Sequence, residues 1–162
     1  MPTAIELASP DDIDELARLR HALYDEYGEA DIPLADYLPA FRAFASRALA
    51  DPRWRAWVAR EGGRIVATMW IEVVERIPQP IRTGGGRPIG YLTNAYVDPG
   101  HRNEGLGTRM LTEIRDWAHA EGVGTVLCWP APGEDAERFY ARAGFGRAGG
   151  PMTLNLPGSP AP

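Results

Sequence analysis

The sequence predicts a mixed α/β domain in which helices flank one sheet. Stretches rich in β-branched and aromatic residues alternate with amphipathic helical stretches, and 44% of the 162 residues are apolar, enough for a sizeable core. The expected order is strand, two helices, three strands, helix, strand, helix and a last strand. We expect a single domain over residues 1–156, followed by a frayed tail over residues 157–162.

The first three elements follow from capping signals and apolar spacing. Ala4–Leu7 is expected to be a short strand, and Ser9 followed by Pro10 and two acids predicts a helix that starts at Pro10. Apolar residues at steps of three and four extend this helix towards Gly28. The same spacing predicts a second helix over roughly residues 34–49.

The middle of the chain predicts three strands. Residues 54–61 and 64–77 are β-rich, and the Gly-Gly pair between them has the composition of a two-residue hairpin turn. Residues 78–88 contain three consecutive glycines and several prolines, so we expect an exposed loop there. A third long strand is expected over residues 89–97.

The last third of the chain predicts a parallel crossover. A helix over residues 105–121 leads from strand 89–97 to an apolar run at residues 123–129, which is expected to be a central, buried strand. A short helix over residues 134–143 follows. A last strand or hairpin is expected within residues 145–156.

Charge and composition exclude several classes of function. All 17 basic residues are arginines, against 22 acidic residues, so the net charge is −5 and no lysine is present for Schiff-base, P-loop or general-base chemistry. Without a basic tract, nucleic-acid binding is not expected. No apolar run is long enough to span a bilayer, so we expect a cytoplasmic protein without membrane contact. The acid excess suits a small cationic partner.

Neither the histidines nor the cysteine predict a metal site. The three histidines have no metal-ligand spacing with one another or with Cys128, so no metal is expected. Cys128, the only cysteine, is interpreted as a small buried hydrophobe. Trp54, Trp57 and Trp70 are expected to belong to the core rather than to the wall of a ligand site.

A cluster of acids surrounds the junction of the first two helices, with no base among them. One interpretation is a solvated helix end and loop. The other is a negative lip that attracts ammonium substrates from a distance. The members of this acidic cluster are Asp25, Glu26, Glu29, Asp31 and Asp36.

Residues 102–108 predict an anion site. Their sequence, Arg-Asn-Glu-Gly-Leu-Gly-Thr, lies between a strand and the first turn of a helix, where free backbone N–H groups and the positive end of the helix dipole converge. Gly105 and Gly107 let a pyrophosphate approach the backbone, and Asn103 tolerates left-handed geometry. By spacing alone the anion signal is weak, and a tight turn with close helix packing is the favoured interpretation.

The neighbouring residues distinguish these interpretations. The run from Tyr91 to Leu111 resembles the acyl-CoA signature of the GNAT N-acetyltransferase superfamily, whose R-x-x-G-x-G core matches residues 102–107. Residues 139–145, Phe-Tyr-Ala-Arg-Ala-Gly-Phe, are similar to its second signature, F-Y-x-x-x-G-F. The resemblance covers about residues 3–156 and extends to small actinobacterial members. It implies a mostly antiparallel sheet with one parallel, splayed pair of strands and flanking helices.

The resemblance also implies the binding site for acetyl-CoA, the acyl donor. The strand backbone at Tyr96 and Val97 would bind the pantetheine arm, and the glycine turn would wrap the pyrophosphate. A backbone N–H near the same two residues would stabilise the oxyanion. The residues expected at the CoA site are Ala95, Tyr96, Val97, Arg102, Asn103, Glu104, Gly105, Leu106, Gly107, Thr108 and Tyr140.

Two side chains are expected to transfer protons. The resemblance places Tyr140 beside the CoA sulfur as the acid that protonates the departing thiolate; without it, Tyr140 would be a packed helix aromatic. Thr93 stands where the family often has a glutamate base, so Glu72, a charge between two apolar strand residues, is the preferred base if it faces the cleft. If Glu72 faces solvent, it is only the polar side of a strand. Glu75 falls on the opposite face and is a weaker candidate.

The leading hypothesis is direct acetyl transfer from acetyl-CoA to a primary amine of a small, cationic acceptor. Two alternatives stay open: a catalytically silent acyl-CoA-binding or regulatory module, and an acetyltransferase that acts on peptide or protein N-termini. The resemblance also implies a homodimer through the C-terminal strands.

Overall fold

The computed structural model describes residues 3–81 and 85–147. The chain divides into two compact units, one ending at Trp129 and the other beginning at Pro130, and each is described by itself. The first unit contains strands β1 (Ala4–Leu7), β2 (Trp54–Glu61), β3 (Arg64–Val74), β4 (Ile89–Val97) and β5 (Thr125–Cys128). It also contains helices α1 (Ile13–Glu26), α2 (Leu34–Ala50) and α3 (Leu106–Ala120), with one-turn 3₁₀ helices at Pro10–Asp12 and Pro99–His101. The second unit contains α4 (Glu134–Arg142).

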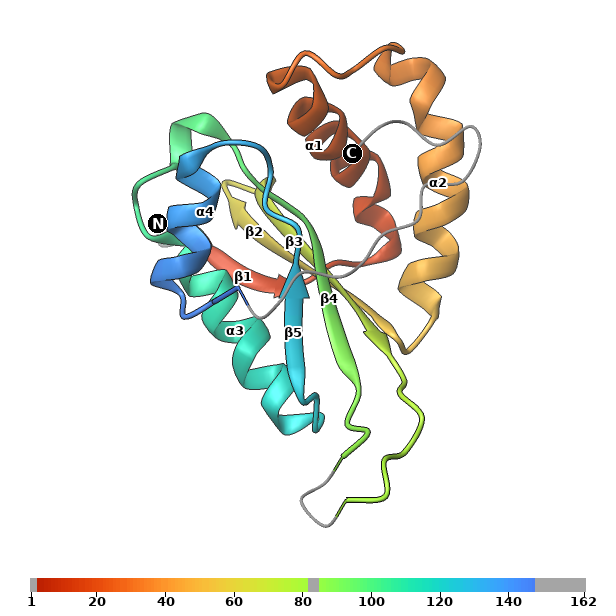
Figure 1. Ribbon diagram of the computed structural model, residues 1–162. Helices are drawn as coiled ribbons and strands as arrows, with labels where there is room; N and C mark the ends of the chain where they lie inside the picture. The colour runs from red at the N-terminus through yellow and green to blue at the C-terminus, as the bar shows by residue number, and fades with distance from the viewer. Residues whose placement is uncertain (1–2, 82–84, 148–162) are drawn as a thin grey trace. The chain divides into compact units, whose positions relative to one another are not determined.

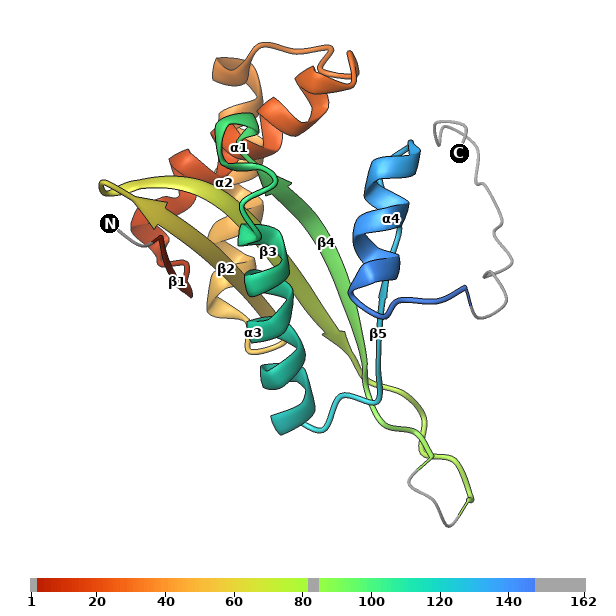
Figure 2. The same cartoon turned by 90° about the vertical axis from the view of Figure 1, so that its left-hand side faces the viewer.

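The five strands form one sheet in the order β1-β2-β3-β4-β5. All neighbouring pairs are antiparallel except β4 and β5, which are parallel and joined through α3. Helices α1 and α2 cover one face of the sheet and α3 covers the other (Figures 1 and 2). The mixed α/β class and the parallel crossover predicted from the sequence are confirmed.

Local signals explain the ends of the first elements. The backbone N–H of Ser9 donates to Asp12 at 2.7 Å, and the Ser9 hydroxyl contacts the same carboxylate, so the expected helix start at Pro10 is a 3₁₀ turn that continues into α1. Both turn glycines of the β2–β3 hairpin have positive φ, Gly62 at 57° and Gly63 at 84°, as a tight hairpin requires.

Two strand predictions need correction. Strand β3 ends at Val74 instead of residue 77, because the following segment leads into the proline-rich loop. Strand β5 is not fully buried: its residues are half-buried or exposed, and within the described residues it pairs on one side only, with β4. An edge strand has a neighbour on one side only, so its apolar side chains are only partly covered. The last strand expected around residues 149–150 lies outside the described residues.

Strand β5 pairs with only the first part of β4. The parallel register joins Ile89 to Thr125 and ends where Leu92 meets Cys128, so residues 93–97 of β4 continue without a partner on β5. Strand β5 ends at this pair, so all four of its residues are paired with β4 (Figure 2). The parallel pair that the sequence resemblance implies is confirmed, and its splaying stays a prediction.

Strand β4 contains a bulge at Asn94. Thr93 lies opposite Trp70 and Tyr96 lies opposite Thr68, so one more residue is accommodated on β4 than on β3. Asn94 has φ of +50°, a left-handed conformation that asparagine tolerates better than most residues. The bulge therefore places Thr93 and Tyr96, three residues apart, on the same face of the sheet.

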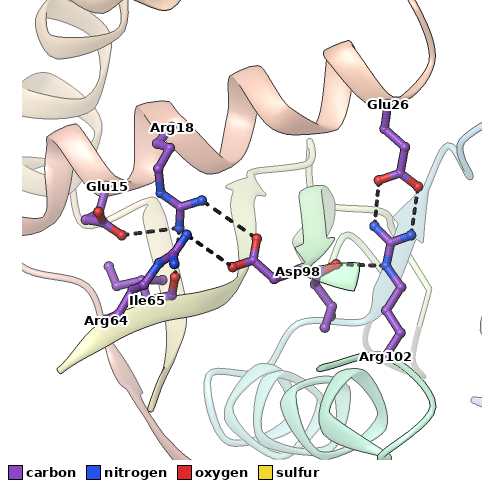
Figure 3. Close-up of polar contacts among 8 residues, drawn as sticks. Glu15, Arg18, Glu26, Arg64, Ile65, Asp98 and Arg102 are labelled. Carbon is purple, nitrogen blue, oxygen red and sulfur yellow. Dashed lines mark hydrogen bonds and ion pairs between the residues drawn. The ribbon is translucent and has the colours of Figure 1, made fainter. Parts of the chain in front are cut away.

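Arginines tie α1 to the segment that follows β4 (Figure 3). Arg102 donates through Nε to the Val97 carbonyl at 2.8 Å and through both terminal nitrogens to the Glu26 carboxylate at 2.6 and 2.7 Å. Four residues before Arg102, the Asp98 carboxylate lies 3.7 Å from the guanidinium of Arg18 in α1. These contacts, at Arg18 and Glu26, fix α1 against the end of β4.

None of the helices within residues 3–81 and 85–147 combines the length and apolarity needed to cross a bilayer.

The conformation of Asn94 predicts opposite outcomes for two substitutions. Asn94→Val should lower the free energy of unfolding by about 1–3 kcal/mol because a β-branched residue is strained at positive φ. Asn94→Gly should be markedly less destabilising because glycine adopts this conformation freely. Both variants lose the asparagine side chain, so the difference between their urea midpoints isolates the backbone term. Equal midpoints would contradict the bulge.

The Arg102–Glu26 pair predicts a pH-dependent stability difference between the wild type and Glu26→Gln. Hydrogen bonds from Arg102 hold the pKa of the Glu26 carboxyl below its ordinary value of 4.5. A carboxyl whose pKa falls on folding stabilises the protein above its unfolded pKa, and the contribution disappears as the pH falls through the folded pKa. Both side chains are about one-third exposed, so we expect less than about 1 kcal/mol at neutral pH, shrinking towards zero below about pH 4.

Denaturant unfolding at several pH values measures this difference. Glu29→Gln is the matched control because Glu29 forms no ion pair with any residue of the described chain. A Glu26→Gln penalty that is the same at acid and neutral pH would show that the charge of Glu26 is not its source.

Candidate active site

A cavity of about 310 Å³ lies between helices α1 and α2 and the sheet. Helix α1 contributes Arg20, α2 contributes residues from successive turns, and β2, β3 and β4 form the floor. The lining residues are Arg20, Tyr37, Ala40, Phe41, Phe44, Trp54, Trp70, Tyr91, Thr93 and Asn94. All of them belong to the first unit.

The aromatic walls of the cavity pack against one another edge to face. The rings of Trp54 and Trp70 are 6.1 Å apart, centroid to centroid, and Phe44 lies 5.4 Å from Trp54. The sequence-based assignment of these tryptophans to the core is therefore incomplete, since Trp54 and Trp70 also line the cavity. Trp57 is a core residue, packed on the opposite face against Trp117 of α3. Alternation along the strand separates Trp57 from the other two.

Arg20 brings a positive charge to the cavity. Its guanidinium donates to the Asn94 side-chain oxygen at 3.3 Å and to the Tyr24 hydroxyl at 2.9 Å, and it lies 4.6 Å from the centre of the Tyr24 ring. Burial raises the pKa of Tyr37, which also faces Arg20, so that phenol is neutral at neutral pH. The sequence does not indicate a role for Arg20, because the apolar spacing of a helix does not distinguish one of its arginines from another.

Glu72 lies at the margin of the cavity. It is half-buried on β3, directly opposite Trp54 on one side and Tyr91 on the other, both of which line the cavity. Residues directly opposite in a ladder share a face, so Glu72 points to the face covered by α1 and α2. Glu75 follows the end of β3 and is exposed. Thr93, where the resemblance places a frequent base, is itself a cavity residue.

The N-terminus of α3 is open and exposed. Asn103 and Gly105 have positive φ, 63° and 76°, and no side chain caps the first turn of the helix. A Cβ built on Gly105 would meet no atom within 4 Å. The first backbone N–H groups of a helix lack intrahelical partners, so this turn presents hydrogen-bond donors to solvent. Such a turn suits an anion.

The other residues expected at the CoA site surround this turn. Ala95 and Val97 are half-buried on β4, whereas Tyr96 is buried, and Arg102 lies over the Tyr96 ring at 5.5 Å. Leu106 is buried in the core, Gly107 is half-buried, and Glu104 and Thr108 are exposed.

One member of the acidic cluster forms an ion pair with an arginine that is distant in the sequence. Glu26 is held by Arg102, which is 76 residues away in the sequence. The other four members, Asp25, Glu29, Asp31 and Asp36, are exposed. Glu29 and Asp31 belong to the connection between α1 and α2. The cluster is therefore partly neutralised, and Arg102 is positioned before any ligand arrives.

In the second unit, Tyr140 is a buried residue of α4. Its ring lies 5.1 Å from that of Phe139 and 5.3 Å from that of Phe145, and its carbonyl accepts from the Phe145 N–H at 3.0 Å. The two neighbouring aromatics belong to the second signature, so the F-Y-x-x-x-G-F pattern builds a small aromatic cluster around the phenol.

Cys128 is half-buried at the end of β5. Burial raises the pKa of its thiol to about 11, so the thiol is protonated at neutral pH and is a poor nucleophile. No group of three or more potential metal-ligating side chains (His, Cys, Asp or Glu) gathers within the part of the chain that the structure describes.

Comparison with known proteins shows the family. Residues 16–145 match the model of the acetyltransferase (GNAT) family. Glucosamine 6-phosphate N-acetyltransferase of Trypanosoma brucei brucei is 29% identical over 114 residues, which are 67% of this chain and 73% of that protein. A GCN5-related N-acetyltransferase from Ralstonia eutropha is 28% identical, with a TM-score of 0.78 over 97% of this chain and 100% of the other.

A predicted acetyltransferase from Clostridium acetobutylicum, solved with acetyl-CoA, has the same fold, with a TM-score of 0.79 at 24% identity over 96% of this chain and 97% of that one. The family match spans most of the sequence, including the glycine turn and both signatures. The chain belongs to the GNAT family and is an acetyltransferase.

Proposed function

We propose that the protein transfers the acetyl group of acetyl-CoA to a primary amine of a small molecule bound in the aromatic cavity. The observation that carries this proposal is the arrangement along β4. Its middle residues line the cavity, and its end leads through residues 98–105, which include a 3₁₀ turn, to the open N-terminus of α3. One strand thus connects a site for an organic acceptor with a site for an anion. Two similar proteins support the same conclusion: one is named as an N-acetyltransferase of glucosamine 6-phosphate, and the other was solved with acetyl-CoA.

The glycine turn is proposed to bind the CoA pyrophosphate. Backbone N–H groups around Gly105 would donate to the phosphate oxygens, with the helix dipole adding to the attraction. Arg102 uses three of its five N–H groups on Val97 and Glu26, so two remain for a phosphate. Upstream, the unpartnered edge of β4 at residues 95–97 would offer backbone groups to the pantetheine arm.

The proposed acceptor chemistry needs a base. An amine is protonated at neutral pH, and only the neutral form attacks the thioester carbonyl. Glu72 is proposed to take this proton, directly or through water, because it is a carboxylate at the cavity margin on the correct face of the sheet. The nitrogen then forms a bond to the carbonyl carbon and releases its extra proton to water, and the tetrahedral intermediate collapses to the amide with loss of the CoA thiolate.

Tyr140 is proposed to donate its hydroxyl proton to that thiolate. Transfer is direct, without an acetyl-enzyme, since a thiol with a pKa of about 11 makes Cys128 unsuited to attack.

The proposed pyrophosphate site predicts weaker CoA binding in Gly105→Val. A branched side chain would occupy the open volume over the turn, and calorimetry should show at least tenfold lower affinity for CoA. The matched control is Gly62→Val in the β2–β3 turn, which also has positive φ and no atom within 4 Å of a built Cβ. Both variants carry similar backbone strain, so only the first should lose CoA. Equal affinities in the two variants would refute the site.

The proposed acid predicts a rate effect in Tyr140→Phe. This change keeps the ring in its aromatic cluster and removes only the hydroxyl. Loss of a general acid typically lowers the chemical step by about ten- to ten-thousandfold. We expect turnover to fall at least tenfold, with CoA affinity and melting temperature nearly unchanged.

Acyl donors with a more acidic leaving thiol should partly restore turnover, because such thiols need less protonation as they depart. Tyr27→Phe, which alters an exposed tyrosine after α1, is the control. Wild-type turnover in Tyr140→Phe, measured where chemistry limits the rate, would return Tyr140 to a packing role.

A further inference from the structure

The charge of the cavity is opposite to that expected for a polycationic acceptor. Arg20 is the one charged residue in the lining, and it forms no ion pair with any acid in residues 3–81 or 85–147. Its hydrogen-bond partners are the Asn94 amide and the Tyr24 hydroxyl, neither of them a carboxylate. A cationic group of a ligand would be repelled here, whereas an anionic group would form an ion pair with the Arg20 guanidinium.

The walls select for a flat, apolar body. Six of the ten lining residues are aromatic, contributed by α2 and by all three neighbouring strands. Tyr37, Phe41 and Phe44 follow one face of α2, and Trp54 and Trp70 pack against this face, with edge-to-face contacts between Trp54 and Phe44 and between the two tryptophans. Aromatic walls gain most from another ring, through offset or edge-to-face contacts. Sugar hydroxyls facing these walls would lose hydrogen bonds to water without replacing them.

The volume also limits the acceptor. A cavity of about 310 Å³ is at the lower end of the range for small-molecule sites, enough for one ring system with short substituents.

We propose that the acceptor is a primary amine that carries an aromatic ring and a carboxylate, with its ring between the α2 aromatics and the tryptophans and its carboxylate on Arg20. This inference rests on the proposed function for the reaction, and on the cavity for the class of acceptor. Arg20 is held by Asn94, the bulge residue, so the anion-binding group is fixed to the same strand that leads to the proposed CoA site.

The test compares acceptors that differ by one group. Phenylalanine has the ring, amine and carboxylate; phenethylamine lacks the carboxylate; and alanine lacks the ring. Spermidine and glucosamine 6-phosphate represent the polycation and the sugar phosphate. With acetyl-CoA and a thiol-release assay, we expect kcat/KM for phenylalanine to exceed those of phenethylamine and alanine by about tenfold or more, as a lost charge-assisted bond or buried ring would produce.

Arg20→Gln tests the carboxylate contact. Glutamine is polar but has no charge, so the preference for phenylalanine over phenethylamine should collapse to near unity, mainly through a loss of kcat/KM for phenylalanine. A merely structural role would lower both activities together. Arg47→Gln, at an exposed arginine of α2 away from the cavity lining, is the matched control and should keep the wild-type preference.

Calorimetry of acceptor binding without acetyl-CoA separates the two proposals. Binding of phenylalanine that depends on Arg20, without thiol release from any acceptor, would overturn the proposed transfer but support the ligand class. Thiol release with spermidine or glucosamine 6-phosphate, and none above background with phenylalanine, would overturn the ligand class while the proposed function stands. An unchanged acceptor preference in Arg20→Gln would also overturn it.

Discussion

The left-handed residue in the middle of β4 is the constraint on which the candidate site depends. In a regular strand, residues 91, 93, 95 and 97 would share a face, and Tyr96 would point towards α3. The bulge at Asn94 instead brings Tyr91, Thr93 and Tyr96 onto the face covered by α1 and α2. Two of these residues form the cavity floor, and the third packs in the core beside it. The left-handed conformation of Asn94 therefore determines that both the cavity floor and the adjoining core receive side chains from β4.

The same strand couples the two parts of the proposed site. Its pairing with β5 ends at Leu92, and within residues 3–81 and 85–147 no strand pairs with the bulge and the residues after it on that edge. The chain then turns through Asp98 and Arg102, whose contacts with α1 hold the start of α3 in place (Figure 3). Because α1 also supplies Arg20, a shift of this helix would move both the cavity wall and the turn that precedes α3.

Much of the fold could be predicted from the sequence because its signals are local. The bounds of β1, β2 and β4 follow from composition and turn residues, and the two signatures identify the glycine turn and α4. The bulge could not be predicted, since a strand pattern indicates only a period of two, although an asparagine in mid-strand was a signal. Long-range pairs such as Arg102 with Glu26, and the exposure of Trp54 and Trp70 to a cavity, depend on tertiary packing.

Donor and acceptor recognition come from different parts of the sequence. The signatures lie in β4, α3 and α4, whereas most of the cavity lining comes from α1, α2, β2 and β3, where the resemblance quotes no motif. Net charge is also a poor guide to the acceptor: the chain carries −5 overall, yet the one charge in the cavity lining is positive. Long-range attraction of an ammonium group and short-range binding of a carboxylate act at different distances, so a zwitterionic acceptor satisfies both.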